Sequence, residues 1–233
     1  ERSGQRGRDD AAGVAAAAKG ANQGEDNKAG QGAGGACARR TARGRPPVTK
    51  YAAGAFRELA SSLPRCVRTP DDVAKLPELF ADAGVRLVYV EALPGAKIDG
   101  CSMFVSKHPV IGLSGRGKRL DKVLFTLLHE IGHILNGHVD ANRLIVEDLE
   151  DKDRHESSQE EEANRSARGW VFPDGFPHVP PRINGSWLEE TAADLRLAPI
   201  VFIGQLQWKG RLDWLTTLAK NAPSVGDVLP NWK

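Results

Sequence analysis

Cysteine is scarce in this chain, and its spacing excludes two kinds of site. The 233 residues contain three cysteines: Cys37, Cys66 and Cys101. Their number is odd, they lie far apart, and no two of them form a C-x-x-C pair. The sequence therefore predicts reduced thiols, with neither a disulfide framework nor a cysteine-based zinc knuckle.

Long hydrophobic runs are also missing. No apolar stretch approaches the roughly 18 residues that a membrane-spanning helix needs, and Gly, Lys and Asp interrupt the alanine-rich opening where a signal peptide would have its apolar region. We therefore expect a cytoplasmic protein that does not enter a membrane. With 40% hydrophobic and 27% charged residues, the chain suits one globular domain of about 150–180 residues plus a tail.

Large apolar side chains are nearly absent from residues 1–49, which we expect to form a disordered basic tail or linker. Residues 1–50 carry twelve alanines, ten glycines, ten basic and five acidic residues, and such a composition cannot bury enough apolar surface to fold. The remainder then divides into a core over residues 50–175 and a helical C-terminal subdomain over residues 176–233. A basic tail can contact nucleic acid, but without aromatic stacking residues a solvated linker is favoured and direct nucleic-acid binding is not expected.

What the chain does contain is a helix with an unusual polar patch. From Lys118 to His138, apolar residues recur every three or four positions, which predicts an amphipathic helix that ends near Gly137. The segment H-E-I-G-H, residues 129–133, lies within it. Residues i and i+4 lie one turn apart on the same face, so both imidazoles can point a nitrogen at one zinc ion. Glu130 is expected on an adjacent edge, where it can reach a metal-bound water without being a ligand.

A plainer interpretation is a buried helix whose histidines are hydrogen-bonded by neighbours, and for any single histidine it is the better one. Three polar groups in one tight patch argue against it here, because burial of Glu130 without a cation would be costly. Gly132 adds a second indication. Glycine costs a helix about 1 kcal/mol relative to alanine, so its presence predicts a strand or helix that packs too closely for a side chain.

A catalytic zinc site needs a third protein ligand and an open position. An extended form of the motif would have a histidine ten residues after His129, where the chain has Val139. His138 is one residue short, and we expect it to point away from the ligand face. His155 falls in a polar stretch that is typical of a solvated loop.

A carboxylate at the start of the next helix is the better candidate. Residues 159–172, followed by a proline, predict that helix. A run of three glutamates is often only a solvated helix start, but Asn164 follows Glu160 by four positions and could hydrogen-bond a ligand from the same face. We therefore prefer Glu160 to Glu161 and Glu162 as the third ligand.

These motifs in this order, H-E-I-G-H, an acidic linker and then E-x-x-A-N, resemble the ImmA/IrrE family of zinc metallopeptidase-like domains. The resemblance implies a zinc site whose ligands are His129, His133 and Glu160. It implies Glu130 as the general base. It also implies a protein substrate, such as a transcriptional repressor, that is cleaved in phage, mobile-element or stress regulation.

The resemblance covers about residues 50–220, with two departures from the family pattern. Ser166 stands where the family usually has an aromatic residue, and residues 170–172 replace a more aliphatic run. Both departures concern the packing of the second helix rather than the ligands.

Around this site the sequence predicts an α+β fold: a zincin-like core with a small mixed or antiparallel sheet, the H-E-x-x-H helix and the helical C-terminal subdomain. Helices are predicted over residues 51–62 and 71–84, and strands over residues 85–91, 100–105 and 109–113. We expect the last of these strands to lie beside the metal helix and to offer its backbone to an extended peptide.

Two further expectations concern the C-terminal part. Ser186 and Glu189 form a capping-box pattern at a helix start, and the helix that begins near Ala198 is expected to pack in the core rather than to bind DNA. His178, in the Pro/Gly-rich loop before them, is the only nearby candidate for stabilising an oxyanion, although most loop histidines have no such role.

The sequence thus leads to two hypotheses. The first is a zinc metallopeptidase that hydrolyses peptide bonds of a regulatory protein. The alternative is a non-proteolytic, antitoxin-like binding module that retains the metal site and contacts its partner without hydrolysis.

Overall fold

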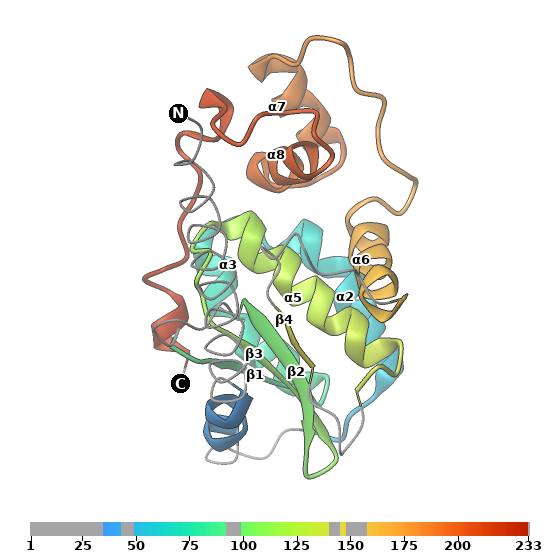
Figure 1. Cartoon of the computed structure of the whole chain (residues 1–233), viewed down its shortest axis with the longest axis vertical. Coiled ribbons are helices and arrows are strands. Elements are labelled where there is room, and N and C mark those ends of the chain that lie inside the picture. The colour runs from blue at the N-terminus through green and yellow to red at the C-terminus, as the bar shows by residue number, and fades with distance from the viewer. Residues whose placement is uncertain (1–34, 43–48, 92–98, 140–144, 148–157, 233) are drawn as a thin grey trace, which may run out of the picture.

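A computed structural model of the chain describes residues 35–42, 49–91, 99–139, 145–147 and 158–232. Its helices and strands, in chain order, are α2 (Ala53–Cys66), α3 (Pro70–Ala74), α4 (Leu76–Asp82), β1 (Arg86–Tyr89), β2 (Gly100–Val105), β3 (His108–Leu113), α5 (Leu120–Leu135), β4 (Ile145–Glu147), α6 (Ser158–Val171), α7 (Gly185–Asp194), α8 (Pro199–Trp208), and the short 3-10 helices η1 (Thr217–Ala219) and η2 (Leu229–Asn231). The predicted α+β class is confirmed, and so is the helical C-terminal part (Figure 1).

The sheet is mixed and small, as predicted. Its strand order is β1-β3-β2-β4, with β1 parallel to β3 and the other neighbours antiparallel. β2 and β3 are antiparallel neighbours and form a hairpin. Ser106 and Lys107 both have positive φ, 51° and 69°, which gives a two-residue turn that suits the twist of a hairpin.

The position of β3 contradicts one expectation. β3 lies inside the sheet, hydrogen-bonded to β1 on one side and to β2 on the other. Its backbone groups are therefore already paired, and the prediction that residues 109–113 add an extended peptide as a neighbouring strand is wrong.

Two helix predictions also need correction. Residues 71–84 form two helices, because α3 ends before Lys75 and α4 begins at Leu76 with a proline in its first turn. At the start of α7 the N-cap is Asn184, whose side chain accepts a hydrogen bond from the Trp187 backbone N–H. Ser186 lies inside the helix and donates to Glu190 instead, so the capping box predicted at this position does not form.

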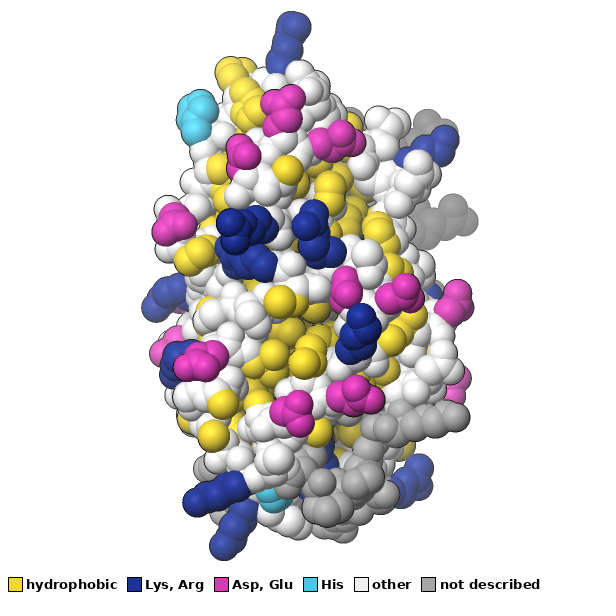
Figure 2. Space-filling view, turned by 180° about the vertical axis from the view of Figure 1, so that it is seen from behind, with side chains coloured by type: hydrophobic (Ala, Val, Ile, Leu, Met, Phe, Trp, Pro, Cys, Tyr) yellow, Lys and Arg dark blue, Asp and Glu magenta, His cyan; other side chains and the backbone are white. Residues whose placement is uncertain are grey.

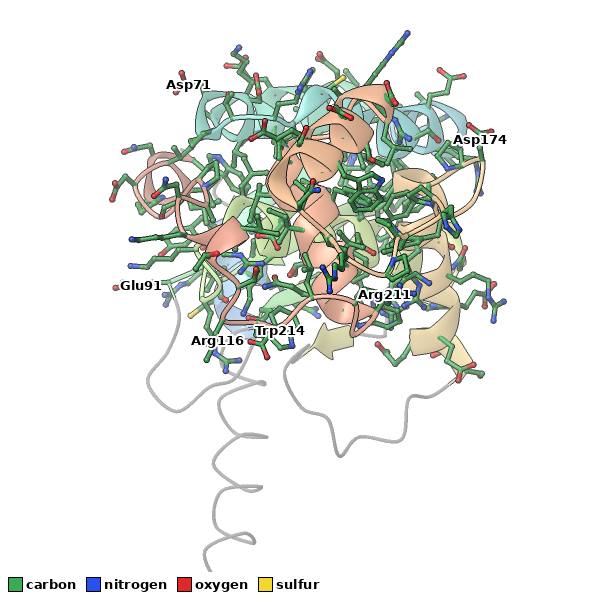
Figure 3. The ribbon with its side chains drawn as sticks, turned by 90° about the horizontal axis from the view of Figure 1, so that it is seen from above. Asp71, Glu91, Arg116, Asp174, Arg211 and Trp214 are labelled. Carbon is green, nitrogen blue, oxygen red and sulfur yellow. The ribbon has the colours of Figure 1, made fainter. Side chains whose placement is uncertain are left out.

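The main core lies between the sheet and the helices, with α5 at its centre. Along the strands, Leu87 and Ile111 join this core, whereas their neighbours Val88 and Val110 join a second cluster on the opposite face, as expected for side chains that alternate across a sheet. On the other side of α5, helix α8 packs against it and α7 packs against α8 (Figure 1 and Figure 3).

The second face of the sheet is covered by a helix at residues 35–42, drawn in blue in Figure 1. Ala38 and Ala42 are fully buried there. A Cβ added at Gly112 would lie 3.0 Å from the Ala38 Cβ, so this cover packs directly on β3. The expected tail over residues 1–49 is therefore wrong for this stretch, and residues 1–34 and 43–48 lie outside the described residues.

Polar contacts hold the C-terminal helices on the start of α5. Arg119 donates to the Gln207 side chain at 2.8 Å, and Gln207 in turn donates to the Asp213 and Trp214 carbonyls. Farther along, Trp232 donates from Nε1 to the Val73 carbonyl at 3.1 Å. Side chains on both sides of the predicted boundary at residue 175 thus belong to one buried cluster.

The surface carries charges of both signs. On the face shown in Figure 2, hydrophobic side chains run down the middle of the molecule, with basic and acidic side chains interspersed among them. Among the described residues, no helix has the length and apolar character needed to cross a membrane.

Candidate metal centre

The H-E-x-x-H segment lies in the second half of α5, at the point where this helix faces α6. The apolar stripe predicted from the sequence faces the core, and His129, Glu130 and His133 are each 0% exposed. Three ionisable groups are therefore buried on one helix, which is costly unless a charged partner or an ion stabilises them.

The ligand atoms converge as the sequence predicted. The Nε2 atoms of His129 and His133 lie 3.0 Å apart. Glu160, near the start of α6, places Oε2 at 3.3 Å from the first and 3.5 Å from the second. Ligand atoms bound to one tetrahedral zinc ion at its usual distances are separated by about 3.3–3.5 Å, so the spacing fits a single small ion, and the three residues form a group that could hold one.

Asn164 determines which nitrogen of His129 faces this point. Its Oδ1 lies 3.1 Å from His129 Nδ1, and both groups are buried. An amide oxygen can only accept, so Nδ1 carries the hydrogen and Nε2 keeps its lone pair for a cation. Asn164 thus makes the contact with a candidate ligand that its position four residues after Glu160 predicted.

The second ligand has a different partner, which the sequence did not predict. His133 Nδ1 lies 3.0 Å from His138 Nδ1, and His138 Nε2 lies 3.1 Å from Glu162 Oε2. His138 was expected to point away, but it is 5% exposed and packs against the ligand.

Gly132 is required by the contact between the two ligand helices. A Cβ at this position would lie 3.0 Å from both the Cα and the carbonyl oxygen of Ala163 on α6. The expectation that a strand or helix packs closely at Gly132 is confirmed, and this close approach brings Glu160 within reach of the histidines.

Glu130 is pressed against β2. A Cβ at Gly100 would lie 2.6 Å from Glu130 Oε1, so the strand has room for the carboxylate only because Gly100 lacks a side chain. Burial raises the pKa of Glu130 to about 7, Glu160 adds to the increase, and His129 and the Ser102 hydroxyl oppose it. A carboxylate with a pKa in this range can accept and release a proton near neutral pH.

His133 is held in the form that binds metals. Burial lowers its pKa below the usual range, and Glu160 opposes this effect. At neutral pH the imidazole is therefore neutral, as ligation requires.

The remaining candidates lie elsewhere. His155 is outside the described residues, and His178 is exposed in the loop between α6 and α7. Cys37, Cys66 and Cys101 are free thiols, and burial raises the pKa of Cys101 to about 12, so this thiol stays protonated. Ser166, a departure from the family pattern, accepts a hydrogen bond from the Asn136 side chain at the end of α5.

No protein-family model matches the chain, and a search of curated proteins finds no match. The fold and the site therefore define the class of protein: an α+β protein with a buried His-His-Glu group of the H-E-x-x-H type that could bind a metal ion.

Proposed function

We propose that this protein is a zinc-dependent peptidase of the ImmA/IrrE type and that it hydrolyses a regulatory protein such as a transcriptional repressor. The observation that carries the proposal is the convergence of two imidazole Nε2 atoms and one carboxylate oxygen, together with the buried Glu130 carboxyl group that interacts electrostatically with His129 and Glu160. When bound, a zinc ion polarises a carbonyl group and makes water acidic near neutral pH.

Glu130 supplies the proton transfer. Its carboxylate takes a proton from the attacking water and later gives it to the amine nitrogen of the broken peptide bond, so that water is divided between the new acid and the new amine. The His129–Asn164 contact holds the His129 imidazole in the tautomer that leaves its Nε2 lone pair for the ion.

Substitution of Glu130 by Gln separates metal binding from catalysis. We expect the E130Q protein to keep one zinc per chain by elemental analysis and to lose cleavage of a peptide library by about 10²–10⁴-fold, measured as new termini by mass spectrometry. Substitution of His129 or Glu160 by Ala should lose the zinc, whereas the exposed neighbour variant E161Q should match wild type in both measurements.

Equal cleavage by wild type and E130Q would show that Glu130 is not the base. A second candidate function is favoured by the complete burial of His129, Glu130 and His133, which also suits an ion that stabilises a binding module. That function predicts one zinc per chain and no new termini with either protein.

A further inference from the structure

The turn that ends α5 carries a histidine back onto a metal-ligand candidate. Gly137 has a φ of +73°, and the backbone N–H of His138 donates to the His133 carbonyl at 2.9 Å, while that of Gly137 donates to the Ile134 carbonyl. This pair of bonds is the Schellman motif, in which a glycine in the left-handed conformation reverses the chain after a helix. The reversal places the His138 ring edge-on against that of His133, with the ring centroids 5.1 Å apart.

When both imidazoles are neutral, only one arrangement of their hydrogens leaves the lone pair of His133 Nε2 available to a cation. Nε2 of His133 must carry the lone pair, so its Nδ1 carries the hydrogen and donates to His138 Nδ1 at 3.0 Å. His138 then carries its own hydrogen on Nε2 and donates to the Glu162 carboxylate at 3.1 Å. Each donor in the series His133, His138 and Glu162 then has an acceptor, and the series ends on a charged carboxylate.

We propose that His138 and Glu162 are positioning residues that fix the tautomer and ring orientation of His133. The proposal rests on the metal site of the proposed function and adds residues that the ligand motif does not contain. His138 acts from the side of His133 that faces away from Glu160, since it contacts Nδ1 whereas Glu160 contacts Nε2. It therefore supports a ligand and does not compete to be one.

The two ligand histidines are supported by different chemistry. His129 donates to a buried neutral amide, whereas His133 donates to an imidazole that a carboxylate orients. The side chain of Glu162 is 53% exposed and that of His138 is 5% exposed, so solvent screens the carboxylate and the imidazole carries most of the effect.

The contrast with Asn164 suggests the decisive variant. In H138N, the side-chain oxygen can occupy the place of the imidazole Nδ1 and accept from His133, as Asn164 does for His129. In H138L, the shape is roughly kept but the acceptor is lost.

The experiment measures zinc affinity by competition with a chromophoric chelator, together with the visible spectrum of the cobalt-substituted protein. We expect H138L to bind zinc about 10–100-fold more weakly than wild type and to show an altered cobalt spectrum. H138N should recover most of the affinity and the wild-type spectrum. E162Q should lose less than H138L, and E161Q, with the neighbouring exposed carboxylate changed, should match wild type.

Each outcome points to one cause. If wild type binds no zinc, the proposed function fails and this inference fails with it. If wild type binds zinc and H138L binds it equally well, only the positioning role is overturned. If folded H138N binds zinc as weakly as H138L does, that role is also overturned. A variant that keeps an acceptor for His133 Nδ1 would then bind zinc no more tightly than a variant that lacks one.

Discussion

At the scale of single residues, hydrogen-bond direction distinguishes the site from a collection of buried histidines. The i, i+4 relation of His129 and His133 is local to one helix, so the sequence could predict it. Glu160 and Asn164 followed from the same periodicity on the next helix. His138 did not, because helical periodicity no longer applies after Gly137. The signal was present in Asn136-Gly137, a typical end of the Schellman type, which places the following residue back over the last turn.

Glu130 gives a pH-dependent prediction at this scale. In the metal-free protein its pKa is raised from 4.5 to about 7, so the folded state binds the proton more tightly than the unfolded chain does. The folded state therefore loses stability as pH rises from about 4.5 to about 7, by a total of about 3 kcal/mol. E130Q lacks this loss.

The measurement is urea unfolding of both proteins with chelator present, at several values between pH 4 and pH 8. We expect the stability of E130Q relative to wild type to increase by about 3 kcal/mol over this range. Effects of His133 and the other titrating groups appear in both proteins and largely cancel in the difference. A difference that stayed constant with pH would contradict the raised pKa.

At the scale of elements, the site depends on how closely α5 and α6 approach each other. The sequence indicated a close contact at Gly132 but could not identify the partner, because the contact joins segments separated by many residues. The structure identifies it as the Ala163 backbone. The same limit explains the error at β3: the strand was predicted from its own residues, but whether a strand lies inside a sheet depends on the order of all the strands.

Two glycine substitutions test this contact. Helix propensity alone predicts that alanine stabilises any helical position by up to about 1 kcal/mol relative to glycine. At Gly169, on α6, an added Cβ meets nothing within 4 Å, and we expect G169A to show that gain. At Gly132 the new methyl group would push against the Ala163 backbone, and we expect a loss of about 1–3 kcal/mol.

Thermal unfolding of G132A and G169A shows directly whether each substitution raises or lowers stability. Zinc affinity gives an independent comparison of the two variants. G132A should bind zinc more weakly because Glu160 moves away with α6, while G169A should bind as wild type does. Stabilisation by G132A would contradict the close packing of the two helices.

At the scale of the whole molecule, the last residues of the chain complete the core formed by the first helices. Trp232 is 6% exposed and packs in the cluster that also contains Phe56 and Phe80. The sequence predicted the helices of the C-terminal part from their apolar residues. It contained no local pattern for the return of residues 217–232, which is fixed by single long-range contacts such as Trp232 with Val73.

Tryptophan substitutions test this closure. We expect W232A to lower the free energy of unfolding by about 3–5 kcal/mol, because a large buried side chain is replaced by a cavity. W232F should lose less, since it keeps most of the apolar surface and gives up the hydrogen bond to Val73.

W214A is the matched control: Trp214 is 52% exposed and lies at the edge of the molecule in Figure 3, so its removal should change stability by about 0.5 kcal/mol or less. Chemical denaturation of the three variants measures these differences, and equal losses for W232A and W214A would show that the end of the chain is not part of the core.

The ligands come from two helices that are joined by a long stretch of chain, with His133 on α5 and Glu160 on α6. An ion that bridges them is a cross-link in the polymer sense, because it closes a loop whose ends are free to separate in the unfolded chain. Unlike a disulfide, this link exists only in the folded chain, where the three ligands meet, so the free energy of zinc binding adds to the free energy of folding. Removing zinc would therefore lower the free energy of unfolding by an amount set by the zinc affinity and concentration, independently of any chemistry that the ion performs.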